Sequence, residues 1–298
     1  MDIGWHMKNL SPKQMIIIPL IIGAVFGSFV IYHSIQHDSF VPLGMEFSGG
    51  TQIEINEIEN MPTDPQERAR IEKAIAKEFG TKVEIAVREN IVRINTTIDN
   101  LDRAQEIENF LRDTEGITGK YNTPQFVGSQ LTSLYREQAE LAGIFAAIAI
   151  SIIVFIAFRN LNTVGGILAV LGLDLVGIFG AMAILNIPLT LASMGGILLI
   201  IGYGIDDNVL LYSRVLKQVG GDVTEKAIGA MKTGLTMAIT SGSALLALYI
   251  VTETPALQQI ASIIIIGIIL DALNTWFFNT GNILRNAKKK KSEYHGRI

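Results

Sequence analysis

Long apolar runs alternate with short polar loops over most of the chain. Six runs come close to the roughly 20 apolar residues that a helix needs to cross a bilayer core about 30 Å thick. They cover residues 15–35, 141–158, 164–185, 189–211, 235–251 and 260–284. The first run is too long for a signal peptide and lacks a small-residue cleavage site, so we interpret it as a permanent span. The pattern predicts an α-helical membrane protein with six transmembrane helices.

The segment between the first and second runs follows a different pattern. Residues 51–56, 82–88 and 91–97 alternate apolar and polar positions, which is typical of strands, with a hairpin turn at Glu89-Asn90. Residues 65–79 and 101–114 have apolar positions at helical spacing, and residues 117–127 supply a last strand. The order β-α-β-β-α-β predicts an α+β ferredoxin-like domain.

These patterns divide the chain into four parts. Residues 1–36 form the N-terminus and the first transmembrane helix, and residues 37–138 form the ferredoxin-like domain. Residues 139–284 hold transmembrane helices 2 to 6, and residues 285–298 form a basic tail.

The short loops predict the orientation in the membrane. Lysine and arginine are concentrated on cytoplasmic loops of membrane proteins. Bases occur before span 1, between spans 2 and 3, between spans 4 and 5, and after span 6, whereas the turns after spans 3 and 5 have none. We therefore expect both termini in the cytoplasm, residues 37–138 outside, and a multi-pass protein of the cell membrane.

Composition narrows the function. The chain has 49% hydrophobic and 17% charged residues, and no cysteine, which excludes disorder, a disulfide scaffold and a thiol nucleophile. A net charge of −4 argues against nucleic acid as a partner. His33 and His37 are interpreted as solvated side chains at the membrane boundary, without a metal-ligand partner at helical spacing. We predict no metal, no cofactor and no enzymatic activity.

Four acids lie within the predicted spans. Asp174 is near the middle of span 3, Asp206 and Asp207 are in the cytoplasmic half of span 4, and Asp271 is near the middle of span 6. A helix-centre Asp costs about 2.5 to 3.5 kcal/mol on insertion scales. No base lies inside spans 2 to 6, so three arrangements are compatible with these acids: protonation, hydrogen bonds to polar neighbours, or a partner subunit. They are candidates for proton coupling, and the alternative is that they hold helices together.

Further polar residues recur at helical spacing. Thr236, Thr240 and Ser243 fall on one face of span 5, and Asp271 and Asn274 are three residues apart in span 6. Together with Asn208 they predict a polar seam inside the membrane.

Two segments resemble the SecD/SecF family of protein-export subunits, on its SecF side. The first follows span 1 and reads Gly-Met-Glu-Phe-Ser-Gly-Gly-Thr, and the second reads Gly-Ile-Asp-Asp-Asn-Val-Leu-Leu-Tyr-Ser-Arg in span 4. The positions that carry the resemblance are Gly44, Glu46, Phe47, Gly49, Gly50, Thr51 and Arg214. The order of one span, an exported domain and five spans is also similar, and the isoleucine-rich, cysteine-free chain is compatible with an archaeal member.

The resemblance implies a function. Members pair a SecF-type subunit with a SecD-type one, associate with a SecYE-type translocon, and assist export of polypeptides, in bacteria with the proton gradient. The family belongs to the resistance–nodulation–division superfamily. The acid of the SecF-like span-4 pattern falls on Asp207 and that of the SecD-like pattern on Asp206, and we rank Asp207 first. The expected partners are a SecD-type subunit, the translocon, the translocating polypeptide and membrane lipid.

An alternative is a proton-coupled transporter of small molecules or lipids from the same superfamily. Such proteins have two six-span halves and two large exported domains, so this chain would then also need a partner.

Overall fold

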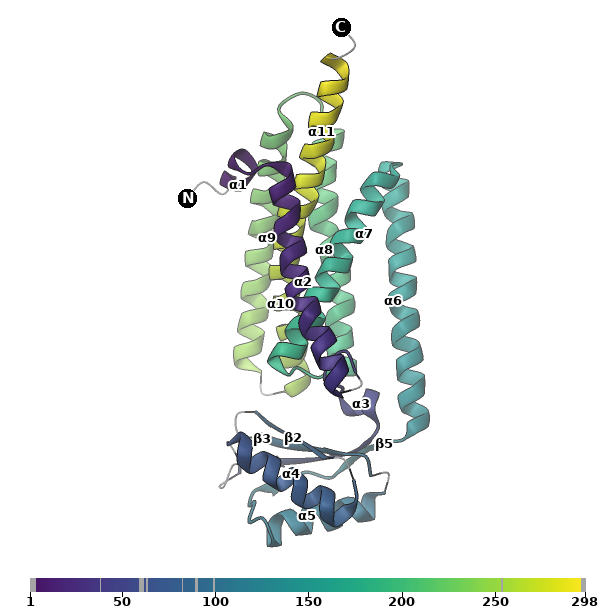
Figure 1. Cartoon of the computed structure of the whole chain (residues 1–298), viewed down its shortest axis with the longest axis vertical. Coiled ribbons are helices and arrows are strands. Elements are labelled where there is room, and N and C mark those ends of the chain that lie inside the picture. Colours follow the sequence, from purple (N-terminus) through teal and green to yellow (C-terminus); the bar gives the residue numbers. More distant parts are fainter. Residues whose placement is uncertain are drawn as a thin grey trace. The chain divides into compact units, whose positions relative to one another are not determined.

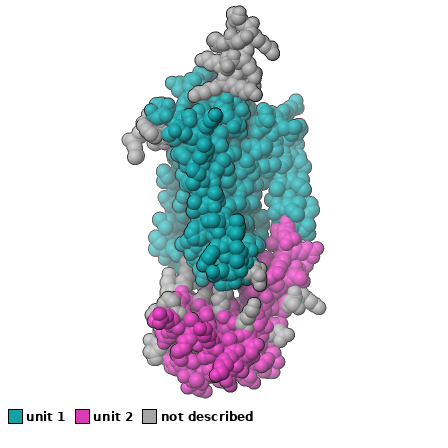
Figure 2. Space-filling model, viewed as in Figure 1, with its two compact units in different colours: residues 1–42, 141–298 teal, residues 43–140 magenta. Residues whose placement is uncertain are grey.

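The chain folds into two compact units (Figure 2). The computed structural model describes residues 4–37, 39–58, 62, 64–81, 83–88, 91–98, 100–252 and 254–295. The larger unit comprises Met1–Pro42 and Leu141–Ile298, and the smaller one comprises Leu43–Glu140. Each unit has its own packing and is described separately.

The larger unit is helical (Figure 1). Its elements are α1 (Trp5–Asn9), α2 (Pro12–His37), the later part of α6 (Ser129–Phe158), α7 (Leu161–Leu185), α8 (Leu191–Lys217), α9 (Val223–Val251), α10 (Pro255–Leu273), η1 (Asn274–Asn279) and α11 (Thr280–His295). Six helices in the described part of the chain are long and apolar enough to span a membrane, and each corresponds to one predicted run. The prediction of a six-span membrane protein is confirmed.

Polar side chains fix where several of these helices begin. Asn160 caps α7 by accepting a hydrogen bond from the Asn162 N–H, 2.9 Å away. Thr190 and Ser193 form a reciprocal capping box at the start of α8. These caps satisfy backbone donors that a helix of any length leaves free at its first turn.

The last predicted span differs from a continuous α-helix. Between α10 and α11 the chain forms the π-helical segment η1. Such segments are rare and frequently occur at functional sites. Here Asn274, Thr275 and Asn279 of this segment are all buried. The extra residue in the turn therefore changes which polar side chains point into the bundle.

Small residues let the helices approach closely. A Cβ on Gly180 of α7 would lie 2.7 Å from the carbonyl oxygen of Phe26 on α2. A Cβ on Gly196 of α8 would lie 3.2 Å from the side chain of Ile263 on α10. Without a hydrophobic drive inside lipid, such backbone proximity is a principal source of helix association. Helix α6 differs, because most of its apolar side chains are exposed, Phe145 and Ile153 among them.

The smaller unit is an α+β domain. Its elements are α3 (Met45–Ser48), β1 (Gly50–Asn56), α4 (Pro65–Phe79), β2 (Val83–Arg88), β3 (Ile91–Thr96), α5 (Leu101–Asp113), β4 (Lys120–Tyr121), β5 (Gln125–Val127) and the start of α6. The antiparallel sheet has the order β2-β3-β1-β4, and β5 pairs with the first residues of β1 whereas β4 pairs with its last ones. This is the ferredoxin-like arrangement that the sequence predicts, except that the last strand is split in two. The predicted turn at Glu89-Asn90 lies outside the described residues.

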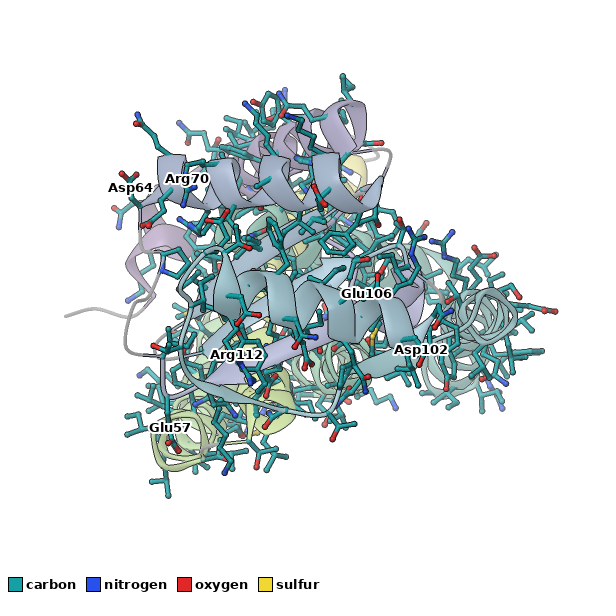
Figure 3. The ribbon with its side chains drawn as sticks, turned by 90° about the horizontal axis from the view of Figure 1, so that it is seen from below. Glu57, Asp64, Arg70, Asp102, Glu106 and Arg112 are labelled. Carbon is teal, nitrogen blue, oxygen red and sulfur yellow. The ribbon has the colours of Figure 1, made fainter. Side chains whose placement is uncertain are left out.

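The alternation of the strands separates a core from a polar face. Ile53, Ile55 and Ile94 point into a core that α4 and α5 close with Ile75 and Ile107. The other face of the sheet is polar, and carries hydrogen bonds such as the one between Gln52 Nε2 and Asn95 Oδ1, 2.8 Å apart. The charged side chains labelled in Figure 3 belong to the surface of this unit, among them the exposed Asp102, Glu106 and Arg112 of α5.

Candidate functional site

Three carboxyl groups are buried among the described residues of the larger unit. Asp174 on α7 is 4% exposed, and Asp207 on α8 and Asp271 on α10 are each 1% exposed. Asp206, the neighbour of Asp207, is exposed. Successive residues of a helix point about 100° apart, which accounts for this difference between adjacent aspartates.

The carboxyl groups of Asp174 and Asp271 both lie close to Gly204 of α8. A Cβ on Gly204 would lie 3.1 Å from Oδ1 of Asp271 and 3.7 Å from Oδ2 of Asp174. Asp174 Oδ1 accepts a hydrogen bond of 2.7 Å from Asn274 Nδ2, and Asp271 Oδ1 accepts one of 3.0 Å from the Thr275 hydroxyl. Two residues of η1 therefore hold one oxygen of each carboxyl group.

Asp207 has a different environment. Neither of its carboxyl oxygens has a hydrogen-bond partner among the described residues, although both are buried. A Cβ on Gly234 of α9 would lie 2.8 Å from Asp207 Oδ1 and would contact the ring of Trp276 in η1. The carboxyl group thus occupies a narrow space between α8, α9 and η1 with no compensating polar contact from these residues.

A chain of buried polar groups continues along α8. Asn208 Nδ2 donates to the Gly204 carbonyl oxygen over 2.7 Å, and Asn208 Oδ1 accepts from Asn279 Nδ2. The Tyr212 hydroxyl donates to Asn279 Oδ1 over 3.2 Å. Thr275 and Asn279 were not singled out from the sequence, and Tyr212 appeared only as a member of the span-4 motif. The signal for Thr275 and Asn279 is spacing, since they follow Asp271 at four and eight residues.

The structure brings together only part of the predicted polar seam. Asn208 and Asn274 lie beside the buried carboxylates. Thr236, Thr240 and Ser243 are exposed on α9, and each hydroxyl donates to the carbonyl four residues earlier. Hydroxyls in membrane helices often satisfy themselves in this way. Among the described residues, these three do not contact the carboxylates.

No base neutralises the three buried acids among the described residues, whose ion pairs, Arg70–Glu115 and Arg93–Glu54, lie in the smaller unit. A buried carboxylate without a counter-ion carries a large desolvation penalty. The described residues therefore offer these acids hydrogen bonds, at Asp174 and Asp271, but no ion pair.

The residues of the first signature form the connection between α3 and β1 in the smaller unit. Gly49 and Gly50 have φ of 72° and 99°, in the left-handed region that favours glycine, and a Cβ on Gly50 would collide with the Thr96 carbonyl. The Thr51 hydroxyl donates to the Ile98 carbonyl over 2.7 Å. Phe47 is buried and its carbonyl accepts from Arg136 of α6. Gly44 precedes α3, with Glu46 in its first turn.

Arg214 and the histidines His33 and His37 are the remaining candidate residues from the sequence. Arg214 is half-buried in the last turn of α8, facing Gly229 of α9. His33 and His37 are four residues apart, so the prediction that neither has a metal-ligand partner at helical spacing is wrong. Their ring centroids are 4.6 Å apart. No group of three or more metal-ligating side chains occurs within the described parts of the chain.

Comparisons with known proteins give the family. The model of "Protein export membrane protein SecD/SecF, C-terminal" matches residues 106–290. The SecF protein of Methanopyrus kandleri is 32% identical over 275 residues, which are 92% of this chain and 94% of that one. The SecF protein of Methanothermobacter thermautotrophicus is 33% identical over 284 residues, 92% of each chain.

A solved structure shares the fold. The crystal structure of SecDF from Thermus thermophilus, a translocon-associated membrane protein, matches with a TM-score of 0.75 at 15% identity. The match covers 93% of this chain but 38% of the SecDF chain. The fold, the family model and the full-length relatives agree, and the chain belongs to the SecF group of the SecD/SecF family of protein-export membrane proteins.

Proposed function

We propose that the chain is an accessory subunit of the Sec translocase without catalytic activity, which acts with a SecD-type subunit and a SecYE-type translocon. The matches span nearly the whole length of the SecF relatives, which supports a role for this chain as a separate subunit. The SecDF structure is much longer than this chain, which is consistent with a SecD-type partner as a further polypeptide.

The single observation that carries the mechanism is the buried carboxyl group of Asp207, which lacks a hydrogen-bond partner among the described residues. Asp174 and Asp271 are nearby, but residues of η1 already bind one oxygen of each. Asp207 is the one of these three acids with both carboxyl oxygens buried and unpartnered among the described residues, whereas Asp271 has one such oxygen. We infer that its proton occupancy sets the packing of α8 against α9 and η1.

The energy available is sufficient for a conformational cycle. One charge that crosses a potential of 100 mV yields about 2.3 kcal/mol, which shifts a two-state equilibrium by roughly 50-fold. One proton per cycle is therefore enough to bias two arrangements of the helices.

The orientation completes the proposal. The distribution of bases among the short loops supports cytoplasmic termini and a smaller unit on the outside, positioned to meet emerging polypeptide. That unit consists of a packed core and polar surfaces, which suits a binding or lever role.

Co-purification tests the subunit role. The full chain, tagged after Ile298 and extracted from native membranes in mild detergent, should recover a SecD-type protein and translocon subunits identified by mass spectrometry. An untagged strain controls for background. Recovery of the chain alone, or only with itself, would contradict the proposal and favour a transporter of the same superfamily.

A matched pair of variants tests the role of Asp207. Asp207→Asn keeps the side-chain volume but removes the titratable proton, and it should abolish the stimulation of precursor export at normal protein level. Asp206→Asn makes the same change at an exposed neighbour and should leave most export intact. Equal export by both variants and the wild type would remove Asp207 from the mechanism.

A further inference from the structure

The two edge strands of the sheet in the smaller unit differ in which backbone groups remain free to form hydrogen bonds. At one edge lies β2, which pairs only with β3 among the described strands, and at the other lies β5, which pairs only with β1. An unpaired strand edge presents backbone groups that can accept another strand. The question is which backbone groups remain available at each edge.

At the β2 edge the central donor is already used. The N–H of Ile85 donates to Glu72 Oε1 of α4 over 2.8 Å. Ile85 is paired with Ile94, whose own partner on the other side is Ile53 of β1. A carboxylate side chain therefore occupies the place that an added strand would take.

At the β5 edge the backbone groups of the central residue, Phe126, remain available. The Glu54 carbonyl of β1 accepts from the Asn122 N–H, so the hydrogen-bonding groups of Glu54 point toward the β4 and β5 side. Because backbone direction alternates along a strand, Gln52 and Gly50 also point there and bond to Gln125 and Val127.

Phe126, which lies opposite Thr51, then directs both its N–H and its C=O away from β1. No hydrogen bond to these two groups occurs among the described residues. The Phe126 side chain is 42% exposed.

A hollow lies at the end of the sheet where β1 begins and β5 ends, and Phe126 contributes to its lining. It has a volume of about 550 Å³ and is lined by Phe126 and Val127 of β5, by the hydroxyl residues Ser48, Thr97 and Thr132, and by Arg136. Arg136 is the one charged side chain among the lining residues. A space of this size takes one or two side chains, and Arg136 favours neutral or acidic ones.

We infer that the β5 edge is a binding site for extended, unfolded polypeptide, which adds to the sheet as a short strand beside Phe126. This inference rests on the proposed export role and names the contact that the exported unit makes. Backbone hydrogen bonds do not depend on sequence, so such a site accepts many clients.

The β5 edge can pair with only a short segment of an added strand. Pro124 has no N–H, so Phe126 supplies the one complete pair of backbone groups in the strand. Short pairing gives weak, rapidly reversible binding, which suits a chain that must keep moving.

The test uses the full chain in detergent and a synthetic peptide. The peptide alternates valine and serine, carries one central glutamate and a fluorophore, and its binding is followed by fluorescence anisotropy. A second peptide has the same side chains but N-methylated amides along one edge. It should bind about tenfold more weakly, because methylation removes backbone donors without changing the side chains.

Two variants locate the site. Phe126→Pro removes the outward N–H while leaving the bonds to β1, and it should weaken binding about as much as methylation does. Phe126→Ala keeps the N–H and should retain most of the affinity. Exchange of the peptide glutamate for glutamine should also weaken binding, because it removes the charge that Arg136 attracts. If Phe126→Pro fails to fold, the comparison of the two peptides on the unchanged protein still decides.

Several results would overturn the inference. They are equal binding of the two peptides, equal binding by Phe126→Pro and Phe126→Ala, or no binding to the wild-type chain. Self-association that competes with the peptide would assign the edge to a second copy instead. The measurement needs neither a partner subunit nor a proton gradient, so its failure leaves the export role to be judged separately by co-purification.

Discussion

Adjacent residues in α8 have opposite environments. Asp206 is exposed whereas Asp207 is 1% exposed, and the buried Asn208 follows. The same sequence motif thus supplies one acid to the surface of the helix and one to its interior. We expect a change of charge at the interior acid to alter helix packing, because no polar group among the described residues compensates it.

The smaller unit also contains a carboxyl group with incomplete hydrogen bonding. Oε1 of Glu108 on α5 is buried without a hydrogen bond among the described residues. Burial raises the pKa of Glu108 above its ordinary value, and the positive charge of Arg112 opposes this by lowering it. The folded state therefore keeps the proton to a higher pH than the unfolded chain does. Stability falls as the pH rises from the unfolded pKa through the folded one.

Glu108→Gln should relieve this penalty. We expect the smaller unit to unfold at a higher urea concentration near pH 7, and the gain to shrink near pH 4, where the carboxyl group is largely protonated. Pulse proteolysis of the full chain in urea measures both. Glu106→Gln, at an exposed position of the same helix (Figure 3), should change little. A gain for Glu108→Gln that is constant with pH would contradict this explanation.

At the scale of elements, the bundle depends on where α9 can approach α8 and η1. Gly234 is the contact point, because any side chain there would meet Asp207 and Trp276. Gly242, two turns later on the same helix, has no atom within 4 Å of where its Cβ would lie. Two glycines of one helix therefore serve different purposes.

Alanine substitution should separate them. Gly234→Ala should destabilise the bundle by about 1–3 kcal/mol through overpacking. Gly242→Ala should be neutral or stabilising by up to about 1 kcal/mol, because alanine has the higher helix propensity. Thermal unfolding in detergent compares the two. Equal shifts would show that α9 does not pack on α8 and η1 through Gly234.

For the whole molecule, the absence of cysteine makes the orientation directly measurable. Thr123→Cys lies at an exposed site of the smaller unit, and Val219→Cys lies at an exposed site between α8 and α9. In intact cells a membrane-impermeant maleimide should label Thr123→Cys, and it should label Val219→Cys only after lysis. The reverse pattern would invert the proposed topology.

Much of this architecture could be predicted from sequence because it depends on composition over long windows. Six apolar runs must become helices in a bilayer, and strand alternation defines one face for the core. The π-helical η1 could not be predicted, since no local residue type requires it and its register follows from tertiary packing.

The polar seam shows the same limit. Helical spacing places Thr236 and Thr240 on one face of α9, but it does not say which face meets a neighbour. The structure exposes both. Asn279 was missed for the converse reason, because its contact with Asn208 joins residues 71 positions apart.

The most direct test of the coupling claim is the dependence of export on the proton gradient. Inside-out membrane vesicles that contain the chain and its partners would translocate a labelled precursor, with the gradient intact or collapsed by an ionophore. For the wild type and Asp206→Asn, we predict that collapse slows the late phase of translocation. For Asp207→Asn the rate should already be low and should not respond to the ionophore. A full response in Asp207→Asn would contradict the account.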